Sequence, residues 1–108
     1  MTKQQLDVLT TLKRARRLIR KGWTRKAHAR NRYGHTVHVQ APTAVRFCAE
    51  GALQRVAPTP FIQLRAQMAL LRSVPSRTVV AHNDLVIKSR AAAVQWFDAA
   101  IAEAHAKA

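Results

Sequence analysis

The sequence predicts a mainly α compact domain of about four helices with at most a minor β-hairpin element. The chain has 108 residues, which suits one domain. Its hydrophobic fraction of 48% is enough for a core, whereas only 6% of its residues are aromatic. Alanine supplies much of the apolar content, and this favours closely packed helices over a β-sandwich. We expect a single domain over 1–108, with a basic N-terminal helix and loop over 1–35 and a helical core over 42–106.

The first predicted helix spans residues 4–21. Basic residues sweep an arc of roughly 160° on the side opposite its apolar face, counting 100° per residue. Gly22 suits the position after the helix, and we expect Trp23 to fold back onto the last turn. The apolar face recurs with helical spacing and comprises Val8, Leu12, Ala15 and Ile19.

Residues 24–41 are less regular. The alternation over 36–39 predicts a short strand or small hairpin. Pro42 then suits the first turn of a second helix, which Pro58 ends. The apolar face of that helix comprises Val45, Cys48, Ala49, Ala52, Leu53 and Val56.

Two further helices follow. Thr59 can cap the third, with Pro60 at its first position and Pro75 at its end. Residues 78–80 are predicted to be a short strand or extended segment. Ser89 can cap the last helix over 90–106. The expected buried faces are Phe61, Leu64, Met68 and Leu71 in the third helix, and Val94, Phe97, Ile101 and Ala104 in the last.

Charge is distributed unevenly along the chain. The formal net charge is +14, and residues 1–35 carry +10 of it, from eleven Lys or Arg and one acid. Residues 36–108 carry only +4. A balance this basic attracts polyanions, and its concentration at one end predicts a localised electropositive surface.

The most basic stretch, residues 13–32, holds ten Lys or Arg and no acid. It could be a solvated helix face. However, like charges four residues apart cost helix stability, and here no acid offsets them, so we expect an anionic partner. Trp23 and Tyr33 are candidates for stacking on bases. The candidate phosphate contacts are Lys13, Arg14, Arg16, Arg17, Arg20, Lys21, Arg25, Lys26, Arg30 and Arg32.

These features predict a non-enzymatic accessory protein of phage or mobile-element type that binds nucleic acid, either RNA or DNA. One alternative is a protein–protein inhibitor that docks on an acidic or nucleic-acid-binding surface of a host factor. Another is a small-nucleotide-binding protein. A helix-turn-helix reading of the segment around residues 57–60 is disfavoured by its two prolines. The sequence leaves the oligomeric state open.

Cys48, His82 and Asp84 are formally the residue types of a nucleophilic triad. Cys48 nevertheless lies on the apolar face of its predicted helix, where a structural cysteine is expected. Glu50 is interpreted as a surface acid or the partner in a satisfied ion pair. Gly51 predicts a close helix crossing, because glycine otherwise costs helix stability.

No metal or cofactor is expected. The pair His35 and His38 is a weak metal signal, and neither a CxxC nor an HExxH motif accompanies it. The three glycines are isolated, so no phosphate-binding loop is present. No apolar run approaches the length of a membrane span, so we expect a cytoplasmic protein and no membrane partner. An alternative interpretation of the Arg-rich N-terminus is a mitochondrial presequence.

Three motifs resemble domain-of-unknown-function family 6197, a group of small bacterial and phage proteins. They are Gly22-Trp23, "VRFCAEGAL" at 45–53, and "HND" at 82–84 before a capped helix. The resemblance covers most of the chain, about residues 6–101. It implies no biochemical activity.

Two departures from the family pattern bear on the interpretation. Phe47 and His82 stand where the family usually has Trp, which weakens a Cys–His pair as a family feature. The resemblance instead implies that Asn83 and Asp84 form a cap or turn that holds the last helix to the Cys48 helix. The alternative is a small polar pocket formed by Cys48, Asn83 and Asp84.

Overall fold

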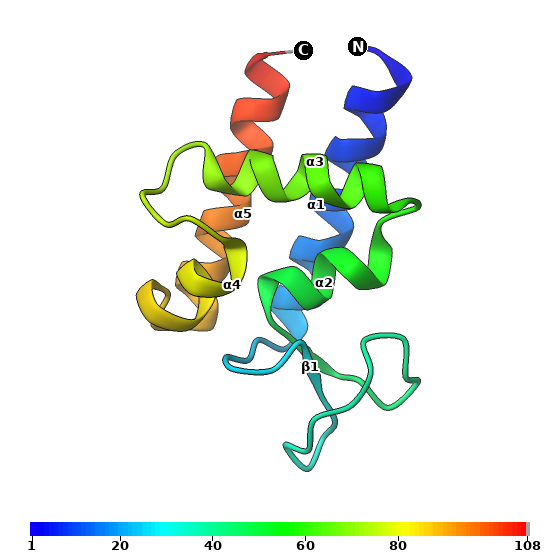
Figure 1. The fold of residues 1–108 in the computed structure, drawn as a ribbon, viewed down its shortest axis with the longest axis vertical. Coiled ribbons are helices and arrows are strands. Elements are labelled where there is room, and N and C mark those ends of the chain that lie inside the picture. The colour runs from blue at the N-terminus through cyan, green and yellow to red at the C-terminus, as the bar shows by residue number, and fades with distance from the viewer. Residues whose placement is uncertain (108) are drawn as a thin grey trace.

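The computed structural model describes residues 1–107, which form a mainly helical domain with a two-stranded antiparallel sheet. In Figure 1, α1 and α5 lie side by side and run in opposite directions, α3 crosses them, and the loops around β1 lie at the far end. The predicted fold class is confirmed. The elements are α1 (Lys3–Lys21), β1 (Ala29–Arg30), β2 (Arg46–Phe47), α2 (Ala49–Val56), α3 (Pro60–Leu71), α4 (Val79–Ala81), the π-helical turn η1 (His82–Val86) and α5 (Arg90–Ala106).

The first helix agrees closely with its prediction. Thr2 caps α1, and its hydroxyl accepts from the Gln5 amide while the Gln5 side chain accepts from the Thr2 amide. This reciprocal pair satisfies two of the N–H groups that a helix start leaves without partners. The buried residues of α1 are Leu9, Thr11, Leu12, Ala15 and Ile19.

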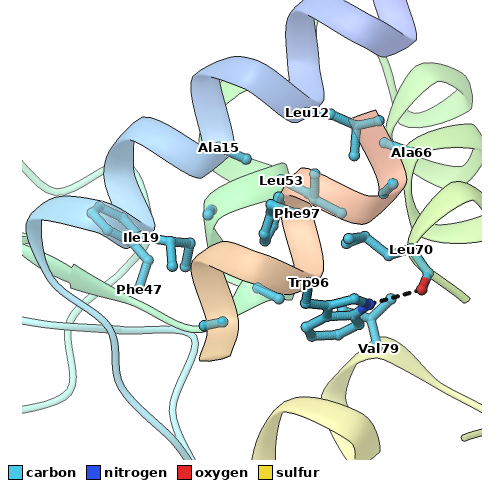
Figure 2. Close-up of a cluster of buried hydrophobic side chains, with 14 of the residues drawn as sticks. Leu12, Ala15, Ile19, Phe47, Leu53, Ala66, Leu70, Val79, Trp96 and Phe97 are labelled. Atoms are coloured by element: carbon cyan, nitrogen blue, oxygen red, sulfur yellow. Dashed lines mark hydrogen bonds between the residues drawn. The ribbon is translucent and has the colours of Figure 1, made fainter. Parts of the chain in front are cut away.

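The core lies where α1, α2, α3 and α5 meet (Figure 2). Alanines at the contact points, such as Ala15 and Ala66, are fully buried and allow the helices to approach closely. Trp96 packs at one edge, and its indole N–H donates to the Leu70 carbonyl at 2.8 Å (Figure 2). The fully buried large apolar side chains are Phe97, Leu12, Ile19, Leu53 and Leu70.

The second helix was predicted to start too early. It begins at Ala49, because residues 46–47 leave the helical path and pair with β1, where Ala29 faces Phe47. Cys48 is the N-cap, and its Sγ accepts from the Gly51 amide at 3.2 Å. Pro42 therefore lies in a loop rather than in a first helical turn.

Of the two predicted β-segments, the first is found only in part and the second was wrong. Within 36–39 only Thr36 makes a β-bridge, to Arg30, and the sheet uses residues 29–30 and 46–47 instead. At 78–80 only Thr78 is extended: it is the N-cap of α4, its hydroxyl accepts from the Ala81 amide, and Val79 and Val80 are helical. In both places a non-local pairing or a cap overrode the local preference of β-branched residues.

The buried faces of α3 and α5 differ from the predicted ones. The caps Thr59 and Ser89 are confirmed. However, α3 buries Ile62, Ala66, Ala69 and Leu70 while Phe61, Leu64 and Met68 stay exposed. In α5 the buried residues are Ala93, Trp96, Phe97 and Ala100. In both helices alanines share the inward face with larger side chains, and the alanines permit close crossing.

Two glycines are required by close backbone approach. Gly22 has an extended φ of −170°, not the left-handed conformation expected after a helix, and a Cβ there would collide with the Val45 carbonyl. At Gly51 a Cβ would collide with the His28 carbonyl. The close neighbour of Gly51 is thus a loop, not the helix that the sequence suggested. Among residues 1–107 no helix is both long and apolar enough to cross a membrane.

Replacing Gly51 by alanine is expected to destabilise the fold by about 2 kcal/mol, because the methyl group pushes against the His28 backbone. In an open helix the same change stabilises by about 0.5–1 kcal/mol. Urea unfolding measures the difference, with Gln54→Ala in the same helix as the control. Increased stability of Gly51→Ala would contradict the close approach.

Candidate nucleic-acid interface

The basic loop that follows α1 is tied to the rest of the protein by Asn83. This side chain is fully buried in η1. Its Oδ1 accepts from the Trp23 indole N–H at 2.8 Å and from the Ala49 amide at 3.0 Å. Its Nδ2 donates to the Thr24 carbonyl at 3.1 Å and to Asp84 Oδ1 at 3.0 Å. All four hydrogen-bonding positions of the amide are used, so one residue joins η1, the loop and α2.

Asp84 extends this connection along the loop. Its Oδ1 accepts from the Lys26 amide at 3.0 Å, and its carbonyl accepts from Arg25 at 3.4 Å. Lys26 has a φ of 63°, in the left-handed region that non-glycine residues seldom adopt. The contact with Asp84 stabilises this conformation and fixes the direction in which the loop leaves α1.

Arg30 organises the interior of the loop. Its Nε donates to Thr24 Oγ1 at 2.9 Å, while its two terminal nitrogens donate to the Gly34 and Arg25 carbonyls at 3.0 and 3.2 Å. These bonds use most of the guanidinium donors. Arg30 therefore supports the loop backbone rather than presenting a free phosphate-binding fork.

The ten basic candidates consequently fall into two groups. Arg16, Arg25 and Arg30 are half-buried and engaged within the protein, Arg16 through an ion pair with Asp98 on α5. In residues 1–107 the other seven form no ion pair. These seven, which we call the cationic face, are all exposed: Lys13, Arg14, Arg17, Arg20, Lys21, Lys26 and Arg32.

The two aromatic candidates also have different environments. Trp23 is half-buried against the core and hydrogen-bonded to Asn83. Tyr33 is 71% exposed, and the Arg32 guanidinium lies 5.1 Å from its ring centre. The turn is fixed by Asn31, whose Oδ1 accepts from the Tyr33 and His35 amides. An accessible aromatic ring is therefore held on an ordered turn.

Sequence reasoning missed Arg46. It is exposed on β2, directly opposite Arg30 in the sheet, and its side chain lies next to Gly22 at the end of α1. It thus adds a cation beside the cationic face. No local signal indicated this, since residue 46 was predicted to be part of a helix in the core.

Cys48 and Asp84 line a cavity of about 170 Å³ together with Lys26, His28 and two apolar residues, but Asn83 does not line it. Burial, with a smaller contribution from the nearby Asp84 charge, raises the pKa of the Cys48 thiol to about 11, against the lowering effect of the Gly51 hydrogen bond. A thiol in this state is a poor nucleophile at neutral pH.

His82 is engaged away from this cavity. Its Nδ1 is within 2.8 Å of Ser76 Oγ, and its ring packs 4.5 Å from the Trp96 ring. Burial lowers the pKa of His82, which favours the neutral imidazole. In the described part of the chain, no hydrogen bond joins His82 to Cys48, so the formal triad is not assembled.

Glu50 is half-buried rather than a free surface acid. Its carboxylate accepts from the Gln67 amide group of α3. Burial raises the pKa of Glu50, while the His28 charge and a Gln63 hydrogen bond lower it. Within residues 1–107, no three His, Cys, Asp or Glu side chains are grouped so that they could hold a metal ion.

Comparison with known families decides the classification. Residues 3–103 match the model of a family of unknown function, DUF6197. The chain belongs to the DUF6197 family. No curated protein and no solved structure matches it. The DUF6197 resemblance implied that Asn83 and Asp84 form a cap or turn that holds the last helix to the Cys48 helix. Asn83 does accept from the Ala49 amide at the start of α2, but it lies in η1, and the cap of α5 is Ser89.

Asn83→Ala is expected to lower the free energy of unfolding by about 3 kcal/mol, because it leaves buried partners at Trp23, Thr24 and Ala49 unsatisfied. Gln95→Ala, which removes an exposed amide from α5, should change it by less than about 0.5 kcal/mol. Urea denaturation measures both values. Equal effects of the two substitutions would show that Asn83 does not join the segments.

Cys48 is expected to react with Ellman's reagent at pH 8 about 100-fold more slowly in the native protein than in urea, because the raised pKa keeps the thiol protonated. The rate should increase with pH up to about 11. Equal rates in the native and unfolded protein would show an accessible, ionisable thiol.

Proposed function

We propose that this protein is a non-enzymatic nucleic-acid-binding protein that contacts phosphates through its cationic face. The observation that carries the proposal is the set of seven exposed basic side chains on one ordered frame. No acidic residue interrupts the sequence over 13–32. The raised pKa of Cys48 and the separate engagement of His82 support a role without nucleophilic chemistry.

The helical part of the cationic face has a regular arrangement. Lys13, Arg17 and Lys21 follow one another at four-residue intervals on the exposed side of α1 and span about 12 Å. Like charges at this spacing repel one another, which an array of phosphates would relieve. The loop adds Lys26 and Arg32 from a backbone that is already ordered, so less entropy is lost on binding.

Tyr33 favours a single-stranded target over a duplex. An exposed ring can stack on an unpaired base, whereas the bases of a duplex present only their edges in the grooves. Arg32 next to the ring can contact the adjoining phosphate. The proposed substrate class is therefore single-stranded RNA or DNA.

Binding of a labelled single strand should weaken steeply as salt rises from about 50 to 200 mM. Lys13→Ala/Arg17→Ala/Lys21→Ala should make the slope of log K against log salt shallower by about 0.7 for each phosphate that the variant no longer neutralises. Fluorescence anisotropy measures both. The control is Arg65→Ala/Arg72→Ala/Arg77→Ala, which removes the same charge from exposed positions outside the cationic face.

Equal slopes for the two triple variants would show that binding depends only on the net charge of the protein and not on the cationic face. No binding to RNA or DNA at low salt would overturn the proposal. A partner that survives nuclease treatment in a pull-down, and is no longer captured by the first variant, would instead support the acidic surface of a host protein as the target.

Tyr33→Ala is expected to weaken single-strand binding by about 1–3 kcal/mol and duplex binding much less, because only the single strand offers a free base face. Tyr33→Phe keeps the ring and should bind like the parent. Phe61→Ala, at an exposed aromatic residue on α3, is the matched control. Equal losses on both nucleic acids would exclude stacking.

A further inference from the structure

A second surface lies on α3, on the side turned away from the core. Phe61, Leu64 and Met68 are 56%, 51% and 45% exposed, although α3 is otherwise packed against α1, α2 and α5. Their spacing places them in one row over about two helical turns. The sequence predicted this row to be buried. In the structure Ile62, Ala66, Ala69 and Leu70 occupy the inward face instead, and Phe61, Leu64 and Met68 are left on the surface.

A groove of about 270 Å³ adjoins this row. It lies between α3, the start of α1 and the end of α5, and Met68 belongs to both the row and the groove. Val8, Ala69 and Ala104 supply further apolar lining, and Gln4 and Gln5 supply polar groups. The surface therefore combines an apolar row with an adjoining recess, a form suited to receiving an amphipathic helix.

The charge at the groove is positive. Arg65 and Arg72 line it, lie seven residues apart on one side of α3, and form no ion pair among residues 1–107. Arg65 lies 5.6 Å from the centre of the Phe61 ring, so a cation is already placed against the apolar row. The third cation of the groove, Lys107, is paired with Glu103 at 2.9 Å. The two free guanidinium groups match carboxylates about two helical turns apart on a partner.

We propose that α3 and the adjoining groove form a docking site for an acidic amphipathic helix of another protein. Its apolar residues would cover Phe61, Leu64 and Met68, and its carboxylates would pair with Arg65 and Arg72. Helix α3 lies towards the end of the molecule that holds the two termini, and the loops around β1 lie at the other end (Figure 1). The protein could thus hold a nucleic acid and a protein partner at the same time.

A second copy of this chain is a poor occupant. Symmetric pairing through α3 would bring Arg65 and Arg72 of one protomer towards the same residues of the other. The net charge is +14 per chain, and the acid beside the groove, Glu103, is already paired with Lys107, so little offsets the repulsion.

In the test, the protein is treated with nuclease and immobilised. Helical peptides of about 16 residues are then selected on it from a displayed random library, in a buffer of about 0.15 M salt. Enriched peptides should carry acids together with an apolar stripe. Their affinity should fall at least about tenfold with Met68→Glu. With Arg65→Glu/Arg72→Glu, selection should favour Lys-bearing peptides instead of acidic ones. Arg77→Glu/Arg90→Glu, at exposed positions outside both the cationic face and the groove, is the matched charge reversal and should leave both affinity and preference unchanged.

Circular dichroism and urea unfolding of each variant establish that it is folded, so a loss of binding reports on the surface. The absence of any enriched acidic peptide would overturn the proposal, as would affinities that Met68→Glu does not change. Two further results would indicate that a different partner occupies the site. One is Met68-dependent flotation with liposomes, which indicates a membrane, and the other is Met68-dependent dimerisation in sedimentation, which indicates a second copy.

Discussion

The hydrogen bonds of Asn83 are the constraint on which the basic half of the protein depends. A buried amide with all four positions satisfied is stable only in one arrangement, because loss of any partner leaves a polar group away from water. That arrangement fixes Trp23 at the end of α1, Ala49 at the start of α2, and Thr24 in the loop between them. Asp84 and Arg30 then determine the path of the loop. Order in this strongly charged segment is thereby maintained by polar contacts together with Trp23 and Ala29, which pack into the core.

The same bonds divide the basic residues by role. Three arginines are used to build the frame, since a guanidinium can satisfy several carbonyls or pair with an acid on another helix. The remaining seven cations are presented outwards, where mutual repulsion costs stability. An anionic partner would relieve this repulsion. Because the cations are held on an ordered backbone, the protein loses less conformational entropy when that partner binds.

Close packing of α1, α3 and α5 has a consequence at the other side of the molecule. Alanines at the crossings bring the helix backbones together, and the inward face of α3 is already filled by Ile62, Ala66, Ala69 and Leu70. Phe61, Leu64 and Met68 are therefore displaced to the surface of α3. The exposed apolar row and the dense core thus have one cause, and the arginines beside the row give it a charge preference.

Composition and periodicity determined the helical class, the inner face of α1, the caps at Thr59 and Ser89, and the concentration of charge before residue 35, because each of these depends on neighbours within a few positions. The family motif also indicated that Asn83 holds segments together. The tertiary structure alone decided that β2 removes residues 46–47 from the second helix, that α3 turns its alanines inward, and that Arg46 joins the basic surface while Arg30 leaves it. These outcomes depend on contacts between residues far apart in the chain. The energies of such contacts outweigh local propensity, and they cannot be read from a short segment of sequence.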